Sequence, residues 1–165
     1  NIEPLFSIIS KKGYEIIKKT KITKIKIASR SLKYDFNLVK KIVNENKKKE
    51  IIISLGMWNK KNLPFKNKNV KYLWCVSKYP AFNEDLRKFP KKFSKNLFFG
   101  YSDHTIGIET CLLAISRGAK LIEKHFTLDK SDTTIRDHAL SATPEEFRNM
   151  VNIGNEISKK LELGI

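Results

Sequence analysis

Two histidines follow apolar, strand-like segments and could hold a metal ion. His104 comes two residues after Ser102, and His125 comes two residues after Glu123. Side chains alternate along a strand, so the members of each pair share one face if strand geometry persists to the histidine. Two neutral imidazoles with substrate oxygens and water suit Mn²⁺ or Mg²⁺ better than a closed zinc site. A purely structural role for either histidine stays open at this point.

Hydroxyl side chains recur where the strand-like segments end, at Ser29, Ser54, Ser77, Ser102 and Thr127. In parallel α/β folds, chemistry gathers at the carboxyl ends of the strands. A single serine at such a place is typical of a cap or a turn. Their recurrence on strand after strand favours a rim that could hold a phosphate group beside a metal.

Strand-like and helix-like patterns alternate along the chain, which is typical of βα units with a parallel sheet. Strands are predicted over residues 24–29, 51–55, 70–77, 97–102 and 119–127, and helices over 34–46, 108–117 and from 144 onward. Thr143, Pro144 and Glu146 form a capping box with proline at the first helical position. Gly118 suits the end of the preceding helix. The pattern fits both an open α/β sheet and five consecutive strands of a barrel.

The composition is strongly basic, with a net charge of +16. Such charge is typical of nucleic-acid binding, but the excess is spread along the chain and is almost all lysine. Arginine, which reads phosphates and guanines with two hydrogen bonds, is scarce. We therefore expect no nucleic-acid partner, and a basic nucleic-acid-binding domain is kept as an alternative. No apolar run is long enough to predict a membrane span.

The two cysteines, Cys75 and Cys111, have apolar neighbours and no metal-like spacing. They are predicted to be buried free thiols, which fits a reducing compartment and a cytoplasmic protein.

Two segments together resemble the paired signature of the sialic acid synthase family. Residues 100–105 read Gly-Tyr-Ser-Asp-His-Thr, and residues 123–129 read Glu-Lys-His-Phe-Thr-Leu-Asp. The family includes the N-acetylneuraminate, legionaminate and pseudaminate synthases. The likeness continues in order through residues 26–29, 54–57, 75–80, 137–138 and 143–147.

The resemblance implies an α/β fold of the TIM (β/α)₈ barrel type, of which residues 1–165 carry roughly strands four to eight and the last helices. The first three strands would precede Asn1, and the antifreeze-like domain that usually follows the barrel would be absent. Members are commonly domain-swapped dimers, so a homodimer is expected for the full-length form.

The resemblance also implies an enzyme that condenses phosphoenolpyruvate with an N-acylated aminosugar, such as N-acetylmannosamine, and releases phosphate. His104 and His125 match the ligands of a catalytic Mn²⁺, with Mg²⁺ as the alternative. Positions that hold the phosphate match Lys26, Ser29, Ser54, Ser77 and Ser102.

Other matched positions would act on the second substrate or on protons. Tyr79 and Asp137 match aminosugar contacts, Glu123 could handle a proton or water, and Lys26 would also orient the enol. Arg30 and Arg136 depart from the family pattern, where glycine and proline are usual. A catalytically inactive barrel fragment and another phosphoenolpyruvate-condensing aldolase are therefore kept as alternatives.

Overall fold

The structure, a computed structural model, describes residues 2–94 and 96–165. The chain divides into two compact units, one ending at Leu73 and one beginning at Trp74. Each unit is described separately below.

The first unit is built on parallel strands joined in chain order. They are β1 (Phe6–Ser7), β2 (Lys24–Ile27), β3 (Glu50–Ser54) and the first part of β4 (Val70–Cys75). The register aligns Lys26 with Ile52, and Ile52 with Lys71. The middle of β3 is an unbroken apolar run that is buried on both faces, as expected for a central parallel strand.

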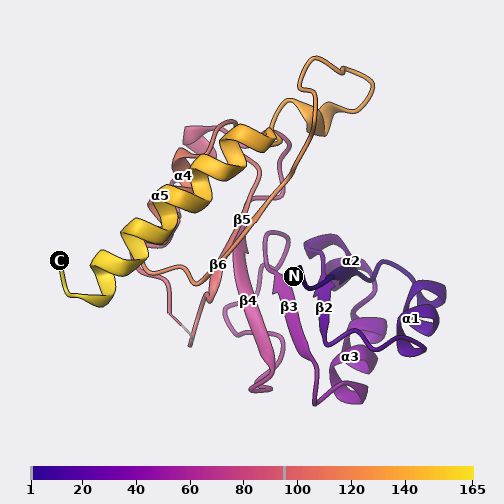
Figure 1. The fold of residues 1–165 in the computed structure, drawn as a ribbon. Coiled ribbons are helices and arrows are strands. Elements are labelled where there is room, and N and C mark those ends of the chain that lie inside the picture. Colours follow the sequence, from indigo (N-terminus) through magenta and orange to yellow (C-terminus); the bar gives the residue numbers. More distant parts are fainter. Residues whose placement is uncertain (1, 95) are drawn as a thin grey trace. The chain divides into compact units, whose positions relative to one another are not determined.

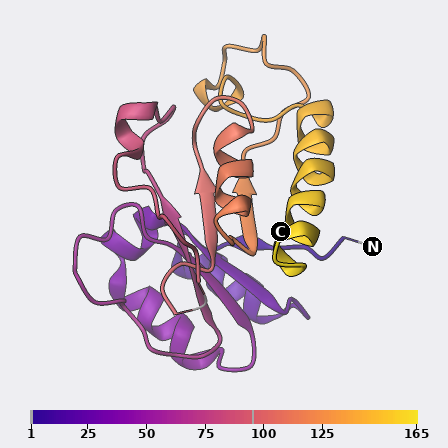
Figure 2. The same ribbon diagram turned by 90° about the vertical axis from the view of Figure 1, so that its left-hand side faces the viewer.

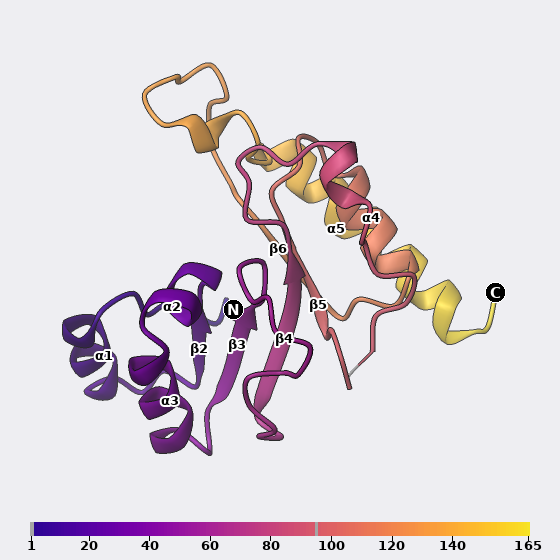
Figure 3. The same cartoon turned by 180° about the vertical axis from the view of Figure 1, so that it is seen from behind.

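Three helices cover one side of these strands, as Figures 1 and 3 show: α1 (Lys11–Lys18), α2 (Ser29–Tyr34) and α3 (Phe36–Glu45). The Ser10 hydroxyl accepts a hydrogen bond from the Gly13 N–H and starts α1. Asp35 does the same for α3 through the Leu38 N–H. The helix predicted over 34–46 is therefore confirmed as α3, whereas the preceding helix α2 was not predicted.

The connection between β3 and β4, residues 55–69, contains no helix in the part of the chain that the structure describes. Instead, two aromatic rings of this connection pack against Phe36 of α3. Phe36 stacks on Trp58 at 5.8 Å and on Phe65 at 5.5 Å between ring centroids. The Tyr72 hydroxyl donates to the carbonyl oxygen of Phe65 at 2.8 Å, which fastens the connection to β4.

The second unit contains η1 (Asn83–Leu86), β5 (Gly100–Asp103), α4 (Glu109–Ser116), β6 (Leu121–Lys124), η2 (Arg136–His138) and α5 (Pro144–Glu162). Strands β5 and β6 are parallel, with Ser102 opposite Glu123. Figure 2 shows α4 and α5 lying side by side. Tyr101, Phe93 and Ala114 form the buried core beside β5.

All five predicted strands are present, although their ends move. Ser29 opens α2 rather than ending a strand, and β6 stops before His125. The short strand β1 was not predicted. The predicted caps are confirmed, because Thr143 and Glu146 form a reciprocal capping box and Gly118 has φ +91°.

Cys75 and Cys111 are buried thiols outside any disulfide bond of the described residues, so that prediction is also confirmed. Within residues 2–94 and 96–165, none of the helices combines the length and the apolar character that crossing a membrane would need.

Candidate active site

Three of the predicted phosphate-binding residues lie at the carboxyl ends of β2 and β3. Lys26 is buried, and its Nζ donates to the Ser54 hydroxyl at 2.9 Å. Ser54 lies two residues beyond the partner of Lys26 in the register, so both side chains occupy the same face. The Ser29 hydroxyl accepts from the Gly56 N–H at 3.0 Å. An ammonium group and hydroxyls held together in this way suit the oxygens of an anion.

In the second unit, His104 is the first residue after β5 and is buried. Its Nδ1 lies 2.6 Å from the carbonyl oxygen of Val76. A carbonyl can only accept, so Nδ1 carries the proton and Nε2 keeps its lone pair. The backbone is held as well, because the Ala81 N–H donates to the carbonyl oxygen of His104 at 2.8 Å.

Burial lowers the pKa of His104 below its ordinary value of 6.5. The hydrogen bond to Val76 works in the opposite direction, and the neighbouring His125 adds to the lowering. A neutral imidazole with a free Nε2 is the form that binds a metal ion.

His125 is the first residue after β6, and its carbonyl oxygen accepts from the Ala142 N–H at 2.7 Å. Its ring centroid lies 5.5 Å from that of His104, with the planes at 64°. On the other side, Asp137 Oδ2 lies 3.7 Å from Nδ1 of His125. A carboxylate beside a ligating histidine typically fixes the orientation of its ring.

Tyr79 lies against both imidazoles. Its ring centroid is 4.0 Å from His104 and 5.8 Å from His125. Burial raises the pKa of Tyr79 to about 12, and nearby negative groups add to the shift. The phenol therefore stays protonated near neutral pH and can donate a hydrogen bond.

Glu123 and Ser102 lie opposite each other on β6 and β5. Ser102 is buried, and Glu123 is partly buried. The charge of Glu123 adds to the raised pKa of Tyr79 and partly opposes the lowering of the His104 pKa by burial, so its carboxylate belongs to the same electrostatic environment as the two rings. Ser77 lies close to Cys75, with 4.0 Å between oxygen and sulfur. The second unit thus brings the predicted metal ligands, aminosugar contacts and proton-handling carboxylate into one neighbourhood.

The two histidines could hold a divalent ion only if water or substrate oxygens supplied the remaining ligands. Among residues 2–94 and 96–165, no group of three or more His, Cys, Asp or Glu side chains is placed to hold a metal. Two neutral imidazoles fit an open site whose other ligands are water and substrate oxygens. The expected Mn²⁺ or Mg²⁺ would thus take its remaining ligands from water and substrate.

The loop that carries Asp137 holds its shape through its own side chains. Asp129 accepts hydrogen bonds from the amide and hydroxyl of Ser131, and Asp132 accepts from those of Thr134. The Thr127 hydroxyl lies 2.7 Å from His138 Nδ1. The guanidinium of Arg136 lies over the Tyr79 ring at 5.5 Å. This departure from the family pattern therefore lies against Tyr79, one of the two predicted sugar contacts.

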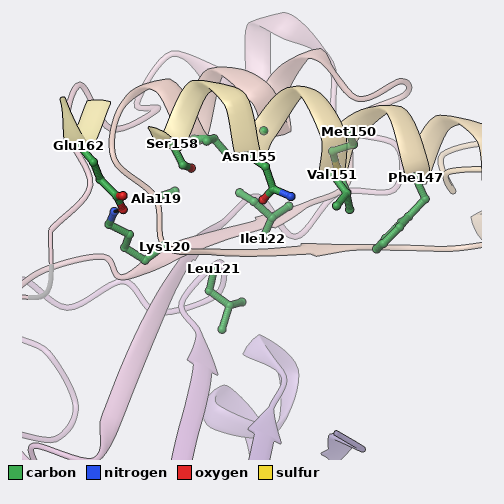
Figure 4. Close-up of a pocket in the computed structure, with 12 residues that line it drawn as sticks. Ala119, Lys120, Leu121, Ile122, Phe147, Met150, Val151, Asn155, Ser158 and Glu162 are labelled. Atoms are coloured by element: carbon green, nitrogen blue, oxygen red, sulfur yellow. Dashed lines mark ion pairs between the residues drawn. The ribbon is translucent and has the colours of Figure 1, made fainter. Parts of the chain in front are cut away.

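A separate hollow of ≈ 350 Å³ lies between α5 and β6 (Figure 4). Its lining is mainly apolar and includes Phe147, Met150 and Ile122. An ion pair between Lys120 and Glu162, at 3.9 Å, closes one end. None of the predicted site residues lines this hollow, so it is distinct from the histidine neighbourhood.

The family model described as the NeuB family matches residues 1–165. The chain belongs to the NeuB family. The resemblance to the sialic acid synthases is thereby confirmed across the whole sequence.

Relatives of this NeuB-family chain include the N,N'-diacetyllegionaminic acid synthase of Campylobacter jejuni, 39% identical over 77% of this chain and 41% of that protein. The pseudaminic acid synthase of the same species is 34% identical over 88% of this chain and 45% of that protein. The chain thus spans less than half the length of these two curated relatives.

A crystal structure of N-acetylneuraminic acid (sialic acid) synthetase from Leptospira borgpetersenii superposes with a TM-score of 0.78. The sequences are 29% identical, and the match covers 94% of this chain and 56% of that chain. The NeuB-family chain therefore has an α/β fold similar to that of a solved sialic acid synthetase.

Sequence reasoning missed Asp103 and Lys124, which directly precede the two histidines. They form an ion pair of 2.6 Å whose side chains are completely buried. The available signal was the alternation along each strand, which places both on the face opposite His104 and His125. Alternation identifies one charged residue on that face of each strand, but the pairing of the two depends on the cross-strand register.

Proposed function

We propose that this chain is the carboxyl-terminal part of a TIM (β/α)₈-barrel synthase, with residues 1–165 as a partial barrel domain. The enzyme joins phosphoenolpyruvate to an N-acylated aminosugar, gives a sialic-acid-type nonulosonate and releases phosphate. The observation that carries this proposal is the pairing of His104 and His125 beside Tyr79 and Asp137 in a NeuB-family chain.

Lys26, Ser29 and Ser54 are assigned to the phosphate of phosphoenolpyruvate, together with Ser77 and Ser102. The hydrogen bond between Lys26 and Ser54 supports this assignment, because it holds the ammonium group in place before the ligand arrives. Lys26 also orients the enol, so that carbon 3 can attack the open-chain aldehyde of the aminosugar.

Tyr79 and Asp137 are assigned to the aminosugar. Tyr79 donates from its protonated phenol, and Asp137 accepts a hydrogen bond from a sugar hydroxyl. His104 and His125 would hold Mn²⁺ (or Mg²⁺), which when bound supplies a Lewis acid for the aldehyde oxygen.

Glu123 is assigned to the water that completes the reaction. The new bond joins carbon 3 of phosphoenolpyruvate to the aldehyde carbon. Water adds at carbon 2 and gives one proton to Glu123, and an equivalent proton passes to the aldehyde oxygen, which becomes a hydroxyl. The bond from carbon 2 to the phosphate oxygen then breaks, the proton of the carbon 2 hydroxyl leaves with the phosphate, and a 2-keto acid remains. We further propose that the full-length protein is a homodimer and lies in the cytoplasm.

The test is phosphate release from phosphoenolpyruvate with N-acetylmannosamine and Mn²⁺, measured for this chain and for the longer protein that contains it. We expect release by the longer protein that a chelator abolishes and added Mn²⁺ restores. The H104A/H125A double variant is the control. Absence of release with N-acetylmannosamine and with other N-acylated aminosugars would overturn the proposal and favour the inactive-module alternative.

A further inference from the structure

The buried pair Asp103 and Lys124 is the centre of a hydrogen-bond network behind the two histidines. Lys124 Nζ lies 2.6 Å from Asp103 Oδ2 and also donates to the carbonyl oxygen of Thr105. The other carboxylate oxygen, Oδ1, accepts from the Tyr101 hydroxyl at 2.6 Å, and from the amide and hydroxyl of Thr105 at 2.9 and 2.8 Å. Cys111 Sγ lies 3.3 Å from Oδ2.

The network grips the backbone on both sides of His104. Asp103 is the residue before the histidine, and Thr105 is the residue after it, so both neighbours are tied to the same carboxylate. Lys124 connects this network to β6. It lies opposite Asp103 in the register and directly precedes His125. One ion pair thus connects the two short segments from which the imidazoles project.

Stability alone gives a poor reason for this arrangement. Removing two charges from water is costly, and a buried ion pair is often no more stabilising than apolar side chains of the same volume. What a fully hydrogen-bonded buried pair does provide is a single allowed geometry. At this place, that geometry is the spacing of His104 and His125.

We propose that Asp103 and Lys124 are positioning residues, which hold the two imidazoles at the separation that one divalent ion requires. The inference rests on the proposed metal role of the histidines. It is therefore tested with one readout that needs the metal and one that does not.

The experiment compares the full chain with the K124M variant and the D103N/K124M variant. The double variant leaves no buried charge without a partner, so it keeps the test informative if K124M alone fails to fold. M150A is the matched control, because Met150 is a buried residue of α5 that lines the hollow, which none of the predicted site residues lines. Thermal unfolding is recorded for each variant.

The metal-free readout is the pattern of ring ¹⁵N shifts of His104, which reports the Nδ1–H tautomer. The metal readout is the affinity for Mn²⁺ alone, by calorimetry. We expect D103N/K124M to lose the single tautomer signature and to bind Mn²⁺ at least about tenfold more weakly, as is typical when support behind a ligand is removed. M150A should keep the tautomer pattern and the Mn²⁺ affinity, even where its melting temperature falls as much as that of D103N/K124M.

An unchanged tautomer pattern in D103N/K124M would overturn the inference and leave the pair a purely structural role. If the full chain itself binds no Mn²⁺ but its tautomer pattern is lost in the double variant, the proposed metal chemistry fails while the positioning role stands. An unchanged Mn²⁺ affinity in D103N/K124M, with binding in the full chain, would also overturn the inference.

Discussion

The carbonyl oxygen of Val76 lies 2.6 Å from Nδ1 of His104 and thereby decides which nitrogen of that ring is available. Val76 is the first residue after β4, and His104 is the first residue after β5. The backbone that follows one strand therefore fixes the protonated nitrogen of a histidine that follows another. A backbone carbonyl cannot be removed by a side-chain substitution. The tautomer therefore depends on how the neighbouring residues hold His104 against Val76. The predictions below follow from this contact and from the neighbouring ones.

The first prediction concerns the two histidines. H104A and H125A should each weaken Mn²⁺ binding by about 100-fold, because an open site with two protein ligands loses half of them. Calorimetric titration with Mn²⁺ measures this. Circular dichroism should show a larger loss of stability in H104A, because His104 is buried and the His125 side chain is 34% exposed. Binding at full affinity in both variants would contradict the assignment.

The second prediction concerns Lys26. K26M should reduce the affinity for phosphoenolpyruvate by about tenfold or more, because a charge-assisted hydrogen bond contributes roughly 1.5–3 kcal/mol. S54A should have a smaller effect, since it removes the support of the ammonium group and one hydroxyl. Equilibrium binding measured without aminosugar checks both. An affinity that K26M leaves unaltered would exclude Lys26 from the phosphate site.

The third prediction concerns Tyr79. Y79F keeps the ring packed 4.0 Å from His104 and removes only the protonated hydroxyl. The KM for the aminosugar should rise by about fivefold, which corresponds to the roughly 1 kcal/mol of a typical hydrogen bond, while the affinity for Mn²⁺ stays the same. A KM identical to that of the parent would remove Tyr79 from the list of sugar contacts.

The fourth prediction is a pH dependence of stability. The pKa of His104 lies below 6.5 in the folded state, so the unfolded chain binds a proton that the folded chain does not. The contribution of His104 to the free energy of unfolding is complete above pH 6.5 and is lost progressively as the pH falls toward the folded-state pKa.

Denaturant unfolding at several pH values between about 7 and 5 should show this loss of stability. H104Q, whose side chain does not titrate, serves as the control, and its stability should fall less steeply over the same range. Parallel slopes for the two proteins would show that His104 is not the group responsible.

The fifth prediction concerns Gly100 at the start of β5. A Cβ added there would lie 1.9 Å from the carbonyl oxygen of Leu121, which is part of the backbone and cannot move aside. G100A should therefore cost about 2 kcal/mol or more, or prevent folding. G13A is the control, because the nearest atom lies at 3.5 Å in α1 and alanine favours a helix by about 1 kcal/mol. Equal stability of the two variants would contradict the close approach of β5 and β6.

Much of the fold could be predicted from the sequence where local chemistry is decisive. The capping box at Thr143 and the apolar run in β3 each specify an element by themselves. The two residues of β1 are too few to show a period, so that strand could not be predicted. The helix-free connection after β3 depends on the long-range stacking of Phe36 with Trp58 and Phe65, which no local pattern reveals.

The candidate site follows the same division. Alternation along two strands places Ser102 with His104 and Glu123 with His125, and the structure has these side chains near one another. The pairing of Asp103 with Lys124 depends on the cross-strand register, and a sequence does not fix that register. The carbonyl of Val76 carries no side-chain signal, so its hold on His104 could not have been foreseen.

The loop from Thr127 to His138 ties its turns together through its own aspartates and hydroxyls. A segment that is braced internally can exchange residues such as Ile135 and Arg136 without disturbing the strands that it leaves. Under the proposed function, substitutions confined to this loop would change the sugar that is bound, while His104 and His125 stay in place. A laboratory exchange of residues 128–138 between relatives would be the corresponding engineering route.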